Sequence, residues 1–215
     1  MTFFDSISDV IDHGYRAVAV DMPIGLPSHT ARISELQARR YLSPRGSTVF
    51  PTPVRACLDA TDYADACRLS VAARGFKISK QSWHILAKIA ELDRAITPAH
   101  SGRVIEAYPE CSFAAMNGDR PLVSKHSVAG IDHRLQLIRR EFHLEPSWVG
   151  PTKLDDVLDA YAMLWTAERF AHGEHRTFPD GEFGSATFDG RGFADADRVL
   201  TVSPKRTVHL RCTLG

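Results

Sequence analysis

Two short apolar runs separated by a long helical stretch constrain the fold of this chain more than any other feature. The run RAVAVD, at residues 16–21, is rich in valine and alanine and predicts a buried strand. The run RVIEAY, at residues 103–108, predicts a second strand. Helical patterns occupy most of the chain between them, and strands joined by helical crossovers pair in parallel. We therefore expect an α/β fold with a helical insertion between the two main strands.

Apolar spacing predicts the helices around these strands. A first helix is expected to end near Gly14, because glycine favours a helix stop. Residues 174–215 are rich in glycine and aspartate, so we treat residues 1–173 as the main domain and 174–215 as an irregular appendage. Within the appendage, residues 198–202 and 207–212 are the candidate strands of a hairpin. Further helices are expected at residues 31–42, 62–74, 79–96, 127–142 and 152–172.

The composition is that of an ordinary globular protein, with 44% hydrophobic and 24% charged residues. The 26 Lys and Arg residues balance the 26 Asp and Glu residues, so any nucleic-acid binding has to use a local basic patch. The four cysteines form no C-x-x-C pair and are expected to be reduced thiols. We find no signal peptide and no apolar run near the ~18 residues of a membrane span, so we expect a cytoplasmic protein without a membrane segment. The sequence leaves the oligomeric state open.

The stretch DDVLD, at residues 155–159, places three carboxylates at the start of an apolar helix. Asp155 is explained by the positive end of the helix dipole, which stabilises acidic side chains in a first turn. That explanation does not extend to Asp159 in the second turn, because an isolated carboxylate among apolar neighbours is costly unless it is paired or bound to a metal. Asp156 and Asp159 are three residues apart and share a helix face. This pair therefore predicts half of a cation site.

Each predicted strand also carries a carboxylate. Asp21 ends the first strand, and taken alone it is explained by an Asx-type turn that leads into Pro23. Glu106 lies within the second strand, where a buried negative charge needs a reason. An ion pair with Arg103 or Arg134 is the alternative explanation for Glu106.

The two strands and the helix face together predict one cluster of carboxylates. Several carboxylates share a site only when protons or cations neutralise them. Oxygen ligands favour Mg²⁺ or Mn²⁺, and two such ions ~4 Å apart activate water for phosphodiester cleavage. The predicted catalytic and metal-binding residues are Asp21, Glu106, Asp156 and Asp159.

Basic and polar residues supply candidates for substrate binding. Arginine holds phosphates well through its paired donors, and several arginines surround the proline-rich loop at residues 43–55. A solvated basic face explains these arginines slightly better, and a surface pair with Glu91 is the simpler explanation for Lys88. The candidate substrate-binding residues are Arg39, Arg40, Arg45, Arg55, Gln81, Lys88, Lys125 and Arg134.

Six sequence blocks stand out because they occur together and in a fixed order. They cover most of residues 15–172. The blocks are VAVDMPIGLP, ARRYLSPRGSTVFPTPVR, SKQSWHILAKIAELD, VIEAYPECSFAAMNG, the segment Ser124-Lys125…Gly130…Arg134, and LDDVLDA.

In that order the blocks resemble the predicted RNase H-like nucleases known as domain of unknown function 429. The resemblance implies an RNase H-like fold, in which a central mixed sheet is flanked by helices. It also implies that Asp21 and Glu106 are the strand carboxylates of a metal-dependent nuclease. By the same resemblance, Asp156 and Asp159 match the acidic pattern of the final helix in such folds.

The start of the chain departs from this family pattern. The family normally opens with a β-hairpin whose first strand carries an aspartate in a G-x-D setting. Here the sequence begins at the helix before Asp21, so we expect the N-terminal hairpin and its acidic ligand to be absent. Two explanations stay open: a reading frame that continues upstream, or an altered and inactive version of the fold.

The predicted function is a metal-dependent nuclease that hydrolyses the phosphodiester bonds of a nucleic acid. The alternative from another class is a catalytically inactive RNase H-like module that binds nucleic acid or protein. DDVLD also fits the D-D-x-x-D pattern by which isoprenoid synthases bind Mg²⁺-diphosphate. That third hypothesis predicts an all-helical chain, and the two predicted strands count against it.

Overall fold

The computed structural model describes residues 4–146, 152–179 and 199–201. Within them the chain is mixed α/β and mostly helical, with little sheet. No helix in these ranges combines the length and apolar character that a membrane crossing requires. In chain order the α-helices are α1 (Ile7–Asp12), α2 (Ile33–Tyr41), α3 (Tyr63–Arg74), α4 (Lys80–His84), α5 (Leu86–Ala95), α6 (Pro109–Met116), α7 (Val128–Phe142) and α8 (Leu154–Ala171).

The two predicted strands are present and pair in parallel, as the sequence indicates. They are β1 (Val18–Val20) and β2 (Val104–Glu106), and Val20 lies opposite Glu106 in the register. The helices α2 to α5 form the expected insertion between them. Both strands are short, so the position of each flanking side chain depends on the loops and helices that pack around the pair.

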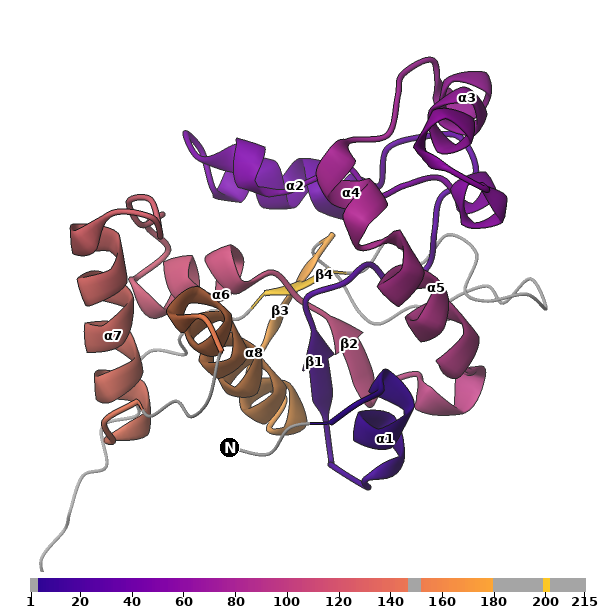
Figure 1. The fold of residues 1–215 in the computed structure, drawn as a ribbon. Helices are drawn as coiled ribbons and strands as arrows, with labels where there is room; N and C mark the ends of the chain where they lie inside the picture. Colours follow the sequence, from indigo (N-terminus) through magenta and orange to yellow (C-terminus); the bar gives the residue numbers. More distant parts are fainter. Residues whose placement is uncertain (1–3, 147–151, 180–198, 202–215) are drawn as a thin grey trace, which may run out of the picture.

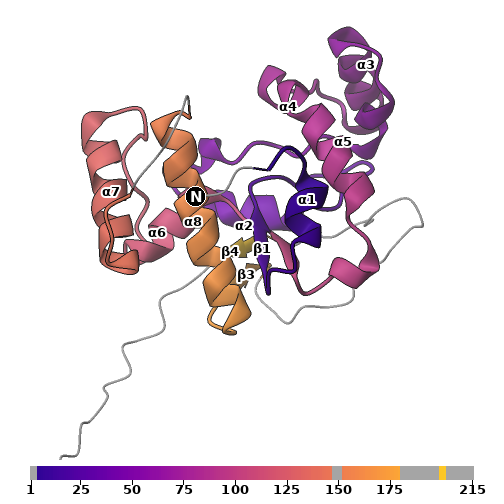
Figure 2. The same ribbon diagram turned by 60° about the horizontal axis from the view of Figure 1, so that its bottom comes forward.

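Helices cover both faces of the β1–β2 pair (Figure 1). α8 lies beside β1, with α6 and α7 beyond it, and α1 and α5 lie on the opposite side. Figure 2 shows the same division after a 60° rotation, with the strands between the two groups of helices. α2 and α4 lie beyond the end of the sheet at which β1 stops. This arrangement leaves the ends of both strands facing α2, α4 and the start of α8.

The two faces of the strand pair carry different side chains. Val18, Val20 and Val104 are buried against α1 and α5. Ala19 and Ala107 instead pack with the apolar side chains of α6, α7 and α8. Since side chains alternate along a strand, Glu106 shares the face of Val20 and Val104, while Asp21 continues the face of Ala19. The small alanines allow α8 to approach the sheet closely.

Two helical details differ from the sequence expectation. The predicted helix at residues 79–96 is divided into α4 and α5, which meet at Ile85. α6 is an additional helix that the apolar spacing did not predict. It begins at Pro109 directly after the second strand, where the fixed backbone angle of proline suits a first helical position. α6 is buried along nearly its whole length, so it lacks the polar face that periodicity analysis detects.

The chain continues into the same body after residue 173. β3 (Arg176–Phe178) pairs antiparallel with β4 (Val199–Thr201). Phe178 is buried against α2 and its ring packs on Tyr41, so the core extends at least to this residue. A strand therefore forms within the predicted segment 198–202, but its partner is β3. The other expected hairpin strand, at residues 207–212, lies outside the described residues.

Candidate functional site

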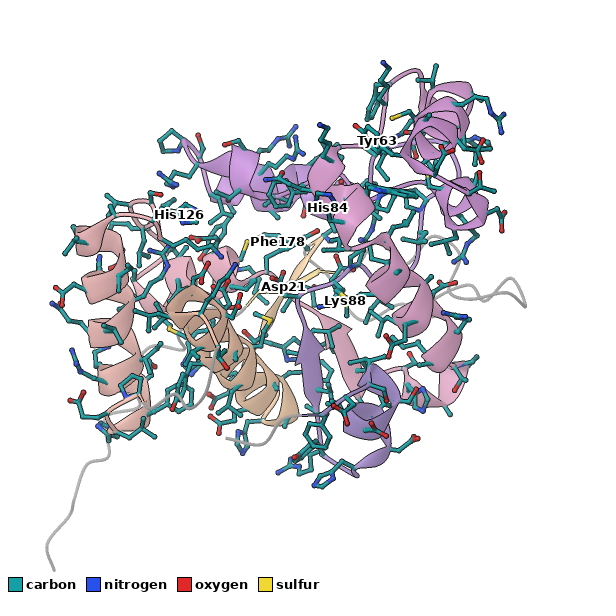
Figure 3. The ribbon with its side chains drawn as sticks, viewed as in Figure 1. Asp21, Tyr63, His84, Lys88, His126 and Phe178 are labelled. Atoms are coloured by element: carbon teal, nitrogen blue, oxygen red, sulfur yellow. The ribbon has the colours of Figure 1, made fainter. Side chains whose placement is uncertain are left out.

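A cavity of about 420 Å³ opens where β1 and β2 end and α8 begins. Loops after the carboxyl ends of parallel strands are a common position for ligand sites. In Figure 3, Asp21 lies in the middle of the molecule at the end of β1, between α8 and the helices α4 and α5. The ionisable side chains that line the cavity are Asp21, Glu110, Asp159, Arg45, Lys125 and His126.

Asp21 and Asp159 form the acidic centre of this cavity. The Asp21 carboxylate is open to solvent and makes no hydrogen bond or ion pair with the described residues. Asp159 accepts a hydrogen bond of 2.6 Å from Lys125 Nζ at its Oδ2 atom. The buried Oδ1 atom of Asp159 has no hydrogen-bond partner among the described residues. The aspartate pair therefore has acceptor oxygens that the described part of the protein does not use.

The pKa values of Asp21 and Asp159 are both raised. Solvent reaches Asp21 through the cavity, but protein atoms surround it on the other sides. Burial is the main cause that raises the pKa of Asp21 to about 8, and the negative charge of Asp159 adds to the rise. Burial also raises the pKa of Asp159, although its hydrogen bond with Lys125 opposes that effect. Raised carboxylate pKa values in a cavity are typical of functional sites.

Lys125 reaches Asp159 from the loop before α7, and a tight turn fixes this loop. The Ser124 carbonyl accepts hydrogen bonds from both the backbone nitrogen and the hydroxyl of Ser127. A Cβ atom on Gly130 would lie 2.0 Å from the Ser124 carbonyl oxygen, so only glycine allows this approach. Burial disfavours the charge of Lys125, but the hydrogen bond and charge of Asp159 outweigh it and raise the pKa of the lysine.

Arg45 is the member of the predicted arginine cluster that lines the cavity. It follows α2 in a turn, and a Cβ atom on the next residue, Gly46, would lie 2.5 Å from the carbonyl oxygen of Arg39. The Nε atom of Arg45 is buried and has no hydrogen-bond partner among the described residues. Arg45 thus adds a second basic side chain to a cavity lining that already includes Lys125, and its Nε atom is not used by the described part of the protein.

Glu106 does not line the cavity but forms a buried ion pair with Arg32. Arg32 donates to both carboxylate oxygens, at 2.9 and 2.7 Å, and the backbone nitrogen of Ile24 donates to Oε2 at 2.7 Å. An arginine partner is the alternative that the sequence left open, but the partner is neither Arg103 nor Arg134. Local sequence gave no signal for Arg32, because its burial arises only from packing between the loop after β1 and β2.

Glu110, which the sequence patterns did not identify as a site residue, lines the cavity together with Asp21 and Asp159. It lies in the first turn of α6, and Arg134 donates to its two oxygens at 2.9 and 2.6 Å. Arg134 is fully buried and also donates to the carbonyls of Val123 and Gly130. It therefore supports the loop that carries Lys125. Glu110 falls inside the block VIEAYPE, which was the available signal for it.

The remaining predicted residues lie away from the cavity lining. Asp156 is exposed on α8, and the neighbouring Asp155 is the one whose charge acts on Lys125. Arg55 forms a 2.8 Å ion pair with Asp93 instead. The other predicted residues outside the cavity lining are Arg39, Arg40, Gln81 and Lys88. Ser82, Ile85 and Ile89, which are near Gln81 and Lys88 on α4 and α5 and at their junction, do line it.

A divalent cation fits the aspartate pair better than it fits the predicted cluster of four carboxylates. Among the described residues, no three His, Cys, Asp or Glu side chains are grouped closely enough to hold a metal ion. Mg²⁺, however, commonly keeps several waters and uses one or two carboxylates together with substrate phosphates. Asp159 Oδ1 and the Asp21 carboxylate have no hydrogen-bond partner among the described residues, which suits that mode of binding.

Comparison with known proteins identifies a family for this chain. No curated protein and no solved structure matches it. The family model described as protein of unknown function (DUF429) matches residues 1–182, which include both strands of the parallel pair, α8 and every residue of the cavity lining. The chain therefore belongs to the DUF429 family.

Proposed function

We propose that this protein is a divalent-metal-dependent phosphodiesterase with an RNase H-like fold that hydrolyses nucleic acid. The observation that carries the proposal is the pair Asp21 and Asp159, which line one cavity and have carboxylate oxygens that the described residues do not use. The order of strand, helical insertion, parallel strand and acidic final helix supports the RNase H-like assignment.

Asp21 and Asp159 are the residues that would hold Mg²⁺ or Mn²⁺ in this proposal. A bound ion would supply positive charge at the phosphoryl oxygens and so stabilise the charge of the transition state. The structure supports one ion between two carboxylates more directly than the two-ion site expected from four. Asp21 would bind the cation only in its ionised form. Its pKa is raised to about 8, so it has to lose a proton before the cation binds.

Lys125 and Arg45 are the proposed phosphate ligands. Lys125 contacts Asp159, one of the proposed cation ligands. A phosphate bound beside Asp159 would therefore contact both the lysine and the bound cation. Arg45 adds the paired donors that suit phosphate oxygens. Arg134, paired with Glu110, positions the loop of Lys125 by donating a hydrogen bond to the Val123 carbonyl.

A non-catalytic binding module is the second candidate. It is favoured by the observation that only Asp21 and Asp159, of the four predicted carboxylates, line the cavity. Such a module would bind a phosphorylated ligand through Lys125 and Arg45 without turnover. The Mg²⁺-diphosphate hypothesis is less favoured, because the parallel β1–β2 pair has no place in an all-helical fold.

The test is Mn²⁺-dependent hydrolysis of single-stranded, duplex, hybrid and branched nucleic acids. We expect Asp21→Asn and Asp159→Asn each to lose at least about 100-fold in kcat, the order expected when electrostatic stabilisation of a transition state is removed. Asp156→Asn is the matched control, because Asp156 is on the same helix but exposed and outside the cavity lining.

Equal activity of Asp159→Asn and the wild type would refute the assignment of Asp159. Binding of nucleic acid without any hydrolysis, together with no Mn²⁺ uptake by calorimetry, would favour the binding module. An equal loss of activity in Asp156→Asn and Asp159→Asn would show that activity depends on the acidic start of α8 as a whole and not on the residues of the cavity lining.

A further inference from the structure

The cavity lining includes a group of apolar side chains, which we call the apolar wall, and the proposed chemistry does not use them. Phe50, Ile85 and Ile89 belong to it. Phe50 is 45% exposed and Ile85 is 38% exposed, although large apolar side chains are normally buried. Exposed apolar groups gathered at a cavity commonly mark a place where a ligand covers them.

Hydrogen bonds at Thr52 fix the loop that carries Phe50. The side chain of Thr52 accepts a hydrogen bond from Arg32, and its backbone nitrogen donates to Glu35. Its carbonyl accepts a hydrogen bond of 2.7 Å from Arg74. Pro51 and Pro53 flank this residue and restrict the backbone further. Phe50 is therefore presented to the cavity by a fixed backbone, which lowers the entropy lost when a ligand binds.

The cavity lining offers the two kinds of side chain that a nucleotide needs, apolar groups for the base and basic groups for the phosphate. Aromatic side chains stack on nucleobases without regard to sequence, because every base has a π-face. Arginine and lysine bind the phosphate. A volume of about 420 Å³ lies near the lower end of the ~300–1,000 Å³ of small-ligand sites.

We propose that the cavity takes one unpaired nucleotide at a time, with its base stacked on Phe50 and its phosphate near Arg45 and Lys125. This inference rests on the proposed function and narrows its substrate class. The substrate is a single strand, a strand end or a displaced nucleotide, because a base inside a duplex is stacked on its neighbours and has to leave the stack to reach Phe50.

The test compares adenosine monophosphate with ribose 5-phosphate, which has the same phosphate and sugar but no base. Binding of each to the full chain is measured by calorimetry with Mg²⁺. We expect the nucleotide to bind about 5- to 100-fold more tightly, the range that base stacking on one aromatic side chain provides. Phe50→Ala should reduce nucleotide binding to the level of ribose 5-phosphate, while Phe50→Tyr should retain it.

Tyr15→Ala is the matched control, because Tyr15 is 42% exposed and does not line the cavity. It should leave both affinities unchanged, and thermal melting of all variants checks that each is folded. Equal affinity of the wild type for the two ligands, no binding of the nucleotide, or an unchanged affinity in Phe50→Ala would overturn the proposal. These binding results test only the nucleotide site. The hydrolysis assay tests the proposed catalytic function, so failure of one proposal can be distinguished from failure of the other.

Discussion

Two carboxylates flank the ends of the paired strands, and their surroundings differ sharply. Glu106 faces Arg32 in a bidentate buried ion pair and accepts a further backbone hydrogen bond. Asp21 points to the opposite face of the sheet, toward Asp159, and has no such partner among the described residues. Removing one partner of a buried ion pair is strongly destabilising, whereas two neighbouring carboxylates raise each other's pKa. Glu106 therefore supports the fold, and Asp21 is the better candidate for chemistry.

The largest effect should come from breaking the Glu106 pair. Glu106→Gln removes the bidentate counter-charge of the buried Arg32 and leaves it only the longer contact with Glu35 at 4.0 Å, so we expect the free energy of unfolding to fall by about 3–5 kcal/mol. Urea titration measures this loss. The double variant Arg32→Met with Glu106→Leu should recover part of it, because the poorly paired buried charge of Arg32 is then removed as well.

The matched control for this prediction is Arg68→Ala, which breaks the exposed pair with Asp65. It should change the urea midpoint little, because exposed ion pairs contribute little to stability. A loss in Glu106→Gln no greater than that in Arg68→Ala would show that Glu106 does not support the fold.

A smaller effect is expected at the turn that carries Lys125. Gly130→Ala forces a Cβ atom against the Ser124 carbonyl, so we expect about 1–3 kcal/mol of destabilisation and a displaced Lys125. The binding of ribose 5-phosphate should weaken along with stability. Val128→Ala, an 85% exposed position on the same helix, is the control and should behave like the wild type. Wild-type stability in Gly130→Ala would contradict the close approach.

The smallest effect concerns the pH dependence of stability at Asp21. Its pKa is raised from 3.8 to about 8 in the folded protein, so between these pH values the folded state holds a proton that the unfolded state has released. Stability contributed by this group is therefore present at low pH and is lost as pH rises toward 8. We expect only about 1 kcal/mol between pH 5 and pH 9, because solvent in the cavity screens the charge.

Asp21→Asn removes this titration, so its advantage over the wild type should grow as pH rises. Urea unfolding in the presence of EDTA at the two pH values measures the difference. Parallel profiles of the two proteins would mean that Asp21 already ionises near its ordinary pKa in the folded state. Asp156→Asn, at an exposed position, should follow the wild type.

The sequence predicted the strands and helices better than it predicted the partners of individual side chains. Local patterns gave both strands, their parallel pairing and the course of α2, α3, α7 and α8. They missed α6, because a helix buried on nearly all sides has no amphipathic period. They also placed Glu106 with Asp21, although alternation along a strand, combined with the register, directs the two side chains to opposite faces.

The family resemblance located most of the cavity but not the role of each residue. Lys125 and Arg45 lie in blocks quoted from the sequence and line the cavity. Arg55 and Arg134 lie in the same blocks but do not line it, since Arg55 pairs with Asp93 and Arg134 pairs with Glu110 of the lining. Asp156 and Asp159 share a helix face on spacing alone, yet the orientation of α8 brings Asp159 to the cavity and leaves Asp156 exposed. A sequence block identifies candidate residues, but the packing of the helices and loops determines which of them line the cavity.

The sequence by itself determined the α/β class, the family and the presence of acidic residues at strand ends, because each depends on local patterns. Only the tertiary structure decided which acidic residues meet. Arg32 is more than seventy residues from Glu106, and Lys125 is 34 residues from Asp159. Such pairs form when distant segments pack together. Local sequence patterns therefore do not predict which charged side chains form ion pairs.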